Sequence, residues 1–216
     1  MDIVDFGTPF GLAFASGLNA YLPLLTFALS VRWLHLYKVN QHFAFVTQSW
    51  FIVTLAILTL LDFVADKIPF IDHAWNAIHT FVRPIVGAAV AVIASSHALP
   101  VALITVTSGQ IRPEVALATL SAIPVTGVGV LVILFIIGAA LATLSHTTKS
   151  TARLVSTLTT AGFFNVVLSL VEDVLVLIVI ALSLFASAVM LILLVLLVLF
   201  LVPRFIRSRN NWIRRY

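Results

Sequence analysis

Two adjacent acidic residues, Glu172 and Asp173, lie in an apolar stretch with no other charged residue between positions 163 and 202. An acidic side chain at the centre of a membrane helix costs roughly 2.5 to 3.5 kcal/mol, and neighbouring carboxylates repel each other. We therefore expect Glu172 either to be protonated or to lie in a wet cavity beside a cationic or hydrogen-bonding partner. Helical spacing puts Asn165 and Ser169 on the face of Glu172. This polar stripe is predicted to bind a proton or cation at the acids and solute at Asn165.

A second polar face runs through the first apolar stretch, because polar residues and a proline recur there every three or four positions. Proline removes a backbone donor and obstructs the preceding turn, so we expect the helix to kink or break between Gly17 and Pro23. Free carbonyls near such a break, together with Asn19, would contact a solute. A packing kink satisfied by neighbouring helices is the alternative. The face consists of Ser16, Asn19, Pro23, Thr26 and Ser30.

Further ionisable positions fall within or at the edge of other apolar stretches. His97 lies near the centre of the predicted third span, where an imidazole can relay protons because its pKa is close to neutral. It can equally be a neutral packing residue. The structural alternative for Glu172 is an interhelical hydrogen bond to Asn19 or His97. Asp62 and Asp66 share a helical face at the end of the second span, with Asp62 a turn deeper. His97 and Asp62 join the predicted solute or ion path.

Two connections between spans carry charge and are predicted to be short half-helices, either re-entrant or interfacial. Residues 66–83 form a turn and a short helix that the Arg83-Pro84 pair ends. Residues 146–160 form a Ser/Thr-rich short helix. Their cations would make a cytoplasmic vestibule suited to an anionic solute or a lipid phosphate. The vestibule residues are Asp66, Arg83, Lys149 and Arg153.

The composition predicts an all-α fold, a polytopic transmembrane helix bundle. Of 216 residues, 62% are hydrophobic and 9% charged, whereas a soluble domain carries roughly 25% charged residues. About six spans of roughly 20 residues use the whole length, so residues 1–216 form one membrane domain. The two last spans divide near Phe185, Ala186 and Ser187, since a single 40-residue helix would be about 60 Å long. The spans are approximately 8–31, 48–65, 85–107, 125–144, 162–184 and 188–202, followed by a basic tail over 203–216.

The distribution of basic residues predicts the orientation of the chain in a cell (inner) membrane. With six spans and both termini cytoplasmic, nine Lys and Arg residues lie inside and three outside, as the positive-inside rule expects. Five of the nine follow the last span, where arginines are attracted to anionic lipid headgroups. This tail explains the net charge of +4 without nucleic acid. Small-residue pairs such as Gly138 with Ala142 permit close helix contact and leave a homo-oligomer open.

No enzyme signature is present, and neither a cofactor nor a metal site is predicted. Cysteine is absent, which removes thiolate ligands and cysteine nucleophiles. His73 and His79 lie six residues apart, on different faces of a helix, and would make a poor metal pair.

Several short motifs occur along the chain from about Gly11 to Asp173. They are Gly17-Leu18-Asn19-Ala20-Tyr21-Leu22-Pro23, Asp66-Lys67-Ile68-Pro69 with Asp72, Arg83-Pro84, His146, Lys149, Arg153, Asn165, Glu172 and Asp173. In these motifs the chain resembles a family of small bacterial membrane proteins known as domain of unknown function 4126. The departure is at the final turn, where a His-Pro-like break is replaced by Phe185-Ala186-Ser187. The family implies a membrane protein and leaves the activity open.

Three classes of function follow from these features. A small transporter or permease is favoured by the broken first helix and the polar fifth span, which would line a path for an unidentified small solute. A non-transporting scaffold or partner subunit would use the same polar residues to join helices. A lipid-modifying enzyme would use the cytoplasmic His73 and His79.

Overall fold

The computed structural model describes residues 6–39, 41–67, 69–95, 125–160 and 163–213. Within these ranges the chain is helical and contains no strand, which confirms the predicted all-α class. The elements are α1 (Gly7–Leu18), α2 (Leu22–Arg32), the 3-10 helix η2 (Gln41–Thr47), α3 (Ser49–Ala65), α4 (Pro69–Ser95), α7 (Val125–Thr160), α8 (Asn165–Phe185) and α9 (Ser187–Ile213).

The first apolar stretch is broken where the sequence predicts it. α1 ends at Leu18 and α2 begins at Leu22, with Pro23 in the first turn of α2, where its missing N–H leaves no donor unused. Asn19 is extended, with φ −133° and ψ 123°. Its side-chain Oδ1 accepts hydrogen bonds from the backbone N–H groups of Tyr21 (3.2 Å) and Leu22 (2.9 Å). Asn19 thus satisfies donors that the break leaves open.

The two short half-helices predicted for the connections are instead parts of longer helices, which corrects the sequence-based boundaries. Arg83-Pro84 does not end a helix, because α4 continues through Pro84 to Ser95. Residues 146–160 form the last turns of α7. No Gly or Pro interrupts α7 after Gly138, and several of its threonine hydroxyls bond to their own helix, as Thr151 Oγ1 does with the Thr147 carbonyl at 2.8 Å.

Three described helices are long and apolar enough to cross a membrane: Trp75–Ser95, Gly129–Thr160 and Asn165–Phe185. The pair Gln41–Thr47 and Ser49–Ala65, bent by 57°, would be a fourth. The count of about six spans therefore remains a prediction. α8 ends at Phe185 and α9 begins at Ser187, so the helices are interrupted at Ala186, where the sequence predicts the turn between its two last spans. The predicted basic tail is helical as far as Ile213, because α9 continues through Pro203.

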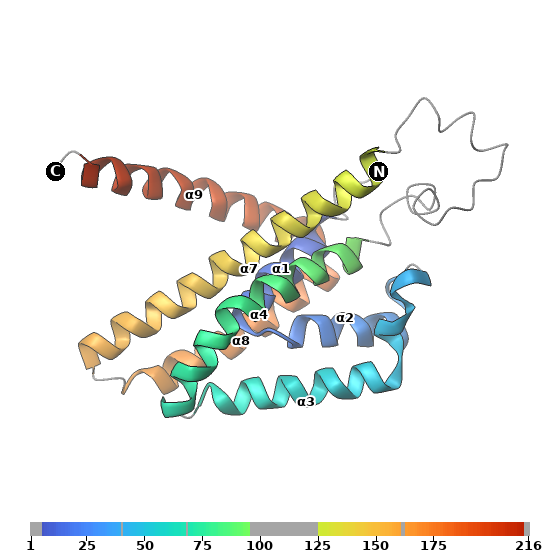
Figure 1. Ribbon diagram of the computed structural model, residues 1–216, viewed down its shortest axis with the longest axis horizontal. Helices are drawn as coiled ribbons and strands as arrows, with labels where there is room; N and C mark the ends of the chain where they lie inside the picture. Colours follow the sequence, from blue (N-terminus) through green and yellow to red (C-terminus); the bar gives the residue numbers. More distant parts are fainter. Residues whose placement is uncertain (1–5, 40, 68, 96–124, 161–162, 214–216) are drawn as a thin grey trace.

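Small residues bring α1, α4 and α7 into close contact (Figure 1). A Cβ atom added at Gly138 would lie 2.7 Å from the Gly87 carbonyl oxygen, and one at Gly87 would lie 2.4 Å from Ala142 Cβ. Helix backbones meet closely in this way in membrane bundles because little side chain separates them.

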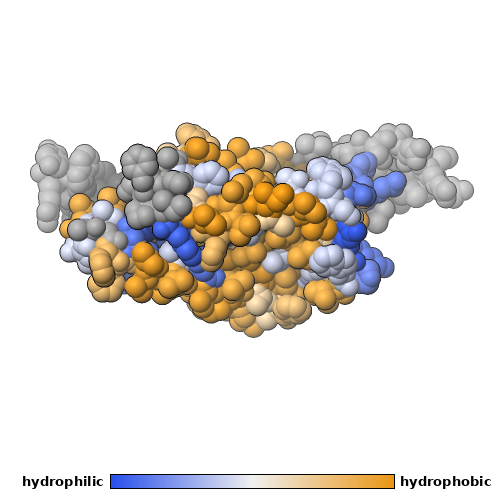
Figure 2. Space-filling model, turned by 90° about the horizontal axis from the view of Figure 1, so that it is seen from below, coloured by the Kyte–Doolittle hydropathy of each residue, from blue (hydrophilic) through white to orange (hydrophobic). Residues whose placement is uncertain are grey.

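α2 and α3 lie side by side at one edge, and α9 leaves the bundle at the end of α8 (Figure 1). Most of the surface seen from below is apolar, with hydrophilic residues gathered toward its two ends (Figure 2).

Candidate functional site

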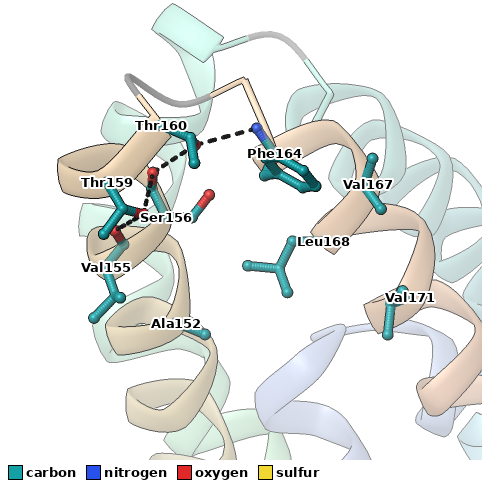
Figure 3. Close-up of a pocket in the computed structure, with 9 residues that line it drawn as sticks. All are labelled: Ala152, Val155, Ser156, Thr159, Thr160, Phe164, Val167, Leu168 and Val171. Carbon is teal, nitrogen blue, oxygen red and sulfur yellow. Dashed lines mark hydrogen bonds between the residues drawn. The ribbon is translucent and has the colours of Figure 1, made fainter.

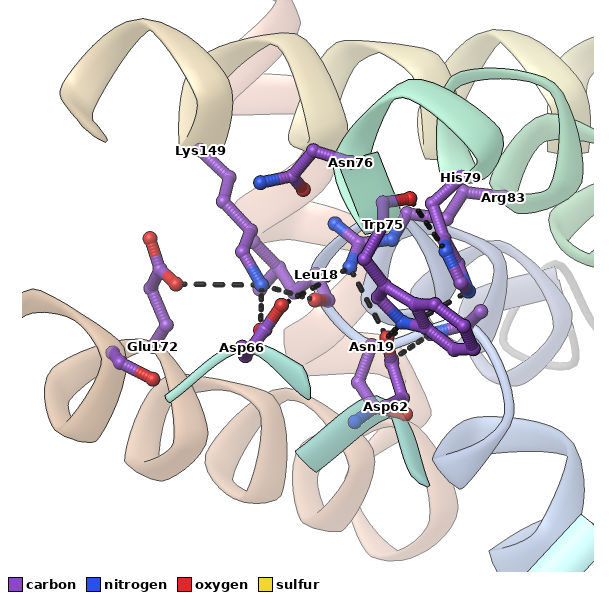
Figure 4. A network of polar contacts seen from close by, with 12 residues as sticks. Leu18, Asn19, Asp62, Asp66, Trp75, Asn76, His79, Arg83, Lys149 and Glu172 are labelled. Atoms are coloured by element: carbon purple, nitrogen blue, oxygen red, sulfur yellow. Dashed lines mark hydrogen bonds and ion pairs between the residues drawn. The ribbon is translucent and has the colours of Figure 1, made fainter. Parts of the chain in front are cut away.

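Six charged side chains from α3 and the residue after it, α4, α7 and α8 meet inside the bundle, and we call them the charge network. Figure 4 labels five of them, all but Arg153. Each side chain is at most 9% exposed. Three are acidic and three basic, so the network is neutral when all six are ionised. Its members are Asp62, Asp66, Arg83, Lys149, Arg153 and Glu172.

Helical periodicity places the members of each helix on one face. Asp62 is on the last turn of α3. Asp66, four residues after Asp62, is the first residue beyond the helix. Lys149 and Arg153 are likewise four residues apart on α7. Glu172 is the eighth residue of α8, roughly 10 Å along the axis from the helix start. Residues four apart share a helical face, so the two acids point together into the bundle, as do the two cations.

Asp62 is fully buried and accepts two hydrogen bonds from uncharged donors. Its Oδ2 accepts from the backbone N–H of Ala20 at 3.2 Å, and its Oδ1 from Trp75 Nε1 at 2.8 Å. The ionic contacts are longer, since Arg83 and His79 each lie 3.6 Å from Oδ1. Asp62 therefore ties α3 to the break between α1 and α2 and to α4.

Asp66 lies just beyond α3, among all three cations of the network. It accepts a hydrogen bond from Lys149 and lies 3.3 Å from Arg153 and 4.0 Å from Arg83. Burial raises the pKa of this carboxyl, but the positive charges of Lys149 and Arg153 together lower it by more than burial raises it. The pKa is therefore below its ordinary value. Asp66 is therefore ionised near neutral pH.

Glu172 shares both of its cationic partners with Asp66. Arg153 donates to Glu172 through NH2 at 2.6 Å and through Nε at 3.4 Å, and Lys149 lies 3.4 Å away. A guanidinium that meets a carboxylate through two nitrogens is held in orientation as well as in position. The pair joins α7 to α8 inside the bundle.

The broken first helix supplies carbonyl oxygens to the same cations. Arg83 NH1 donates to the Gly17 carbonyl at 3.1 Å, and Lys149 Nζ donates to the Leu18 carbonyl at 3.0 Å. These carbonyls belong to the last turn of α1, where intrahelical partners are missing and the helix dipole is negative. The break and the charge network therefore form one site.

The family model described as Domain of unknown function (DUF4126) matches residues 7–112 and 111–207, nearly the whole chain. The chain belongs to the DUF4126 family. Asp62, Asp66 and Arg83 fall in the first matched range, and Lys149, Arg153 and Glu172 fall in the second. No curated protein and no solved structure matches the chain. The DUF4126 description names no activity, so the function has to be argued from the site.

Three predicted path residues of this DUF4126 chain are not members of the charge network. Asp173 forms a separate pair with Lys67 at 2.8 Å, and both side chains are about a quarter to a third exposed, at 26% and 30%. Asn165 donates to Thr157 Oγ1 at 3.0 Å near the start of α8, and Asn19 caps the helix break beside the network. His97 falls outside the residues that the structure describes. The two remaining path residues, Asp62 and Glu172, join the four predicted vestibule residues in the network.

Several residues that contact the network were not among the predicted path or vestibule residues. Trp75 and His79 lie eight and four residues before Arg83 on one face of α4. His146 Nδ1 lies 3.1 Å from Arg83 NH1, three residues before Lys149 on α7. This spacing is visible in the sequence, but it points to the site only once Arg83 is known to face Asp62 of α3 and His146 of α7.

Some buried polar atoms of the network and of the neighbouring His79 have no hydrogen-bond partner. Asp66 Oδ1, Arg83 Nε and NH2, and His79 Nε2 are buried without a hydrogen-bond partner. A buried polar atom without a partner costs roughly 1 to 3 kcal/mol, so such atoms favour water or a polar ligand beside them. Among the described residues, no three His, Asp or Glu side chains are grouped to hold a metal ion.

Proposed function

We propose that the chain is a small membrane transporter that couples a proton to an anionic solute at the charge network. Glu172 takes the proton, and Lys149 with Arg153 binds the anion. The proposal rests on one observation, which is that two buried cations each lie between the same two carboxylates, Glu172 and Asp66.

Stability alone is a poor reason for such a cluster. Removing ions from water costs several kcal/mol each, and apolar replacements of buried ion pairs are often neutral or stabilising. Ionisable groups inside membrane bundles instead mark ion and substrate pathways by default. Six of them at a helix break therefore support a transport role over a purely structural one.

The charge balance of the network provides the coupling. With Glu172 ionised, Lys149 and Arg153 are neutralised by Glu172 and Asp66. A proton on Glu172 leaves two cations facing only Asp66, with a net charge of +1, and this excess positive charge attracts an anion. Proton and anion then bind together, because each lowers the cost of burying the other.

Asp66 serves as the fixed counter-ion in this scheme. Its pKa is below the ordinary value because Lys149 and Arg153 outweigh the effect of burial, so it stays ionised when Glu172 takes the proton. A permanent carboxylate beside the two cations keeps anion binding reversible, which transport requires.

The break between α1 and α2 supplies the irregular backbone of the path. Unwound segments occur at membrane depth where they are buried or line a cavity, and broken helices place carbonyls at substrate and ion sites. Asn19 holds the break through the N–H groups of Tyr21 and Leu22, while the carbonyls of Gly17 and Leu18 face the cations.

The proposed setting is a bacterial cell (inner) membrane with both chain ends on the cytoplasmic side, as the positive-inside rule favours. The arginines beyond Pro203 would meet anionic headgroups. Gly138 and Ala142 pack against α4 within the chain, so association with a second copy would use other helix faces.

Flux in proteoliposomes tests the transport function. Vesicles containing a trapped pH indicator receive inward gradients of sulfate, inorganic phosphate or succinate as anion probes. We expect protein-dependent acidification of the lumen with at least one probe, lost in Glu172→Gln and kept in Asp173→Asn. Asp173 is the matched control because it is the next residue and pairs with Lys67 outside the network.

A non-transporting scaffold is the second candidate, favoured by the full pairing of the six charges. It predicts no anion-driven proton movement in the wild type and a lower melting temperature for Glu172→Gln. Wild-type flux that Glu172→Gln retains in full would remove Glu172 from the mechanism.

A further inference from the structure

A groove separates the last turns of α7 from the first turns of α8 (Figure 3). Its volume is about 310 Å³, at the lower end of the range for small-molecule sites. It runs from Thr160 and Phe164 at the α7–α8 connection to Ala152 and Val171, with Leu168 between the two helices. The eight residues from Ala152 to Thr160 span roughly 12 Å of helix.

The groove is apolar along its length and carries hydroxyl groups on its α7 wall, with no charged residue lining it. Two of the hydroxyls are used within the protein. Thr159 donates to the Val155 carbonyl at 2.8 Å, and Thr160 donates to the Ser156 carbonyl at 2.7 Å. The hydroxyl oxygen of Ser156 is buried and has no hydrogen-bond partner. A polar atom of a bound molecule would satisfy it.

The surroundings of the groove indicate what fills it. Both helices are candidate membrane spans, and large apolar side chains beside the groove are exposed, including Leu158 at 77% and Phe163 at 86%. Exposed apolar surface of this kind on spanning helices is covered by lipid. The groove is continuous with that surface, so the molecules that reach it first are membrane lipids.

We propose that the groove binds one acyl chain of a membrane glycerolipid, whose ester carbonyl accepts a hydrogen bond from Ser156. The carbonyl lies toward the α7–α8 connection, and the chain extends toward Ala152 and Val171. A glycerolipid fits both features of the groove, because it joins a long apolar chain to a hydrogen-bond acceptor at one end.

The position of the groove links this lipid to the charge network. Arg153 follows Ala152, and Glu172 follows Val171, so the inner end of the groove lies beside the ion pair that joins α7 to α8. An acyl chain there would fill the space between the two helices next to that pair. The lipid site does not depend on the transport function, and its test uses no flux measurement.

Photocrosslinking tests the site directly. The full chain is reconstituted in nanodiscs that contain phosphatidylglycerol with a diazirine midway along one acyl chain, and adducts are mapped by mass spectrometry. We expect adducts concentrated on groove residues such as Leu168. Ala152→Trp, which fills the inner end, should lower them about tenfold. Leu158→Trp, on an exposed face of α7 outside the groove, should leave them unchanged.

The ester contact has its own test in the same nanodiscs. A diether phosphatidylglycerol, which lacks the ester carbonyl, should compete for the wild-type groove about fivefold less well than the diester. In Ser156→Ala the two should compete equally. Adducts spread evenly over Leu168 and the exposed Leu170 and Leu177, or equal competition in the wild type, would overturn the proposal and leave only the general lipid shell.

Discussion

Two regions of the molecule join neighbouring helices by opposite means. One is the close contact among α1, α4 and α7, and the other is the charge network. In the first, Gly87 and Gly138 let backbones touch, and an added Cβ atom would meet fixed backbone. In the second, long side chains span the space between helices, and the ionic contacts of Asp62 with Arg83 and His79 are 3.6 Å long. Close backbone packing permits one arrangement, whereas a set of shared charges can exchange partners.

α3 shows the consequence of this difference. Many of its large apolar residues face outward, among them Leu60 at 63% exposed, and its inward residues include Asp62. Asp66, directly after the helix, reaches the cations of α7. α3 thus packs against α2, with Leu55 in the apolar core, and reaches α4 and α7 largely through carboxylates, while α1, α4 and α7 form a packed unit. We expect changes in charge to move α3 and α8 relative to that unit.

The largest expected effect comes from removing one charge of the network. Arg83→Met leaves Asp62 and Asp66 with less compensation at a fully buried position, and breaking a buried pair in this way costs about 3 to 5 kcal/mol of unfolding free energy. Thermal unfolding in detergent measures it. Arg32→Met, at a partly exposed arginine that binds Thr47 and Ser49, is the control and should cost much less. Equal losses would show that the network is no more critical than a surface contact.

The packed unit is tested by a pair of glycines on α7. Gly138→Ala places a Cβ 2.7 Å from the Gly87 carbonyl oxygen, and overpacking of this kind costs about 1 to 3 kcal/mol. Gly129→Ala meets nothing within 4 Å and should stabilise the helix by a few tenths to about 1 kcal/mol. Opposite signs in denaturation experiments are therefore expected. A stabilising Gly138→Ala would contradict the close contact of α4 with α7.

The helix break gives a smaller effect. Asn19→Ala leaves the N–H groups of Tyr21 and Leu22 without their acceptor and should cost about 1 kcal/mol, the usual loss of a capping side chain. Asn19→Ser, which keeps a capping oxygen, should recover most of it. If both variants match the wild type in melting temperature, Asn19 does not hold the break.

The smallest expected effect is the pH dependence of stability that comes from Asp66, because this carboxylate titrates far below neutral pH. Because its pKa is lower in the folded protein than the ordinary value, the ionised carboxylate stabilises the fold above the unfolded pKa of about 3.9. This contribution is lost as the pH falls through the folded pKa. The stability difference between wild type and Asp66→Asn should be constant from about pH 5 to 8 and shrink below about pH 4. A difference that grows on acidification would reverse the sign of the argument.

Local chemistry made part of this structure predictable. Gly17 and Pro23 with Asn19 between them predicted the break, and the length limit of a membrane span predicted the turn at Ala186. Arg83-Pro84 misled the prediction of helix ends, because proline weakens a helix locally while the packing of α4 against α1 and α7 holds it together.

The site was predictable residue by residue but not as an arrangement. Acidic and basic residues in apolar sequence are expensive, so Glu172, Asp62 and Asp66 could be selected from the sequence alone. Which cation faces which acid depends on how helices distant in the chain pack, as with the 2.6 Å contact from Arg153 to Glu172. The separate pairing of Asp173 with Lys67 depends on the same packing, and no local pattern distinguishes the two adjacent acids.

Proton uptake on anion binding tests the central claim most directly. Sulfate, which does not titrate near neutral pH, is added to the purified protein in weakly buffered detergent solution, and bound sulfate and absorbed protons are measured together. The exchange between Glu172 and an anion predicts about one proton absorbed per sulfate in the wild type and none in Glu172→Gln. Sulfate binding without proton uptake in the wild type, or equal uptake in both proteins, would contradict it.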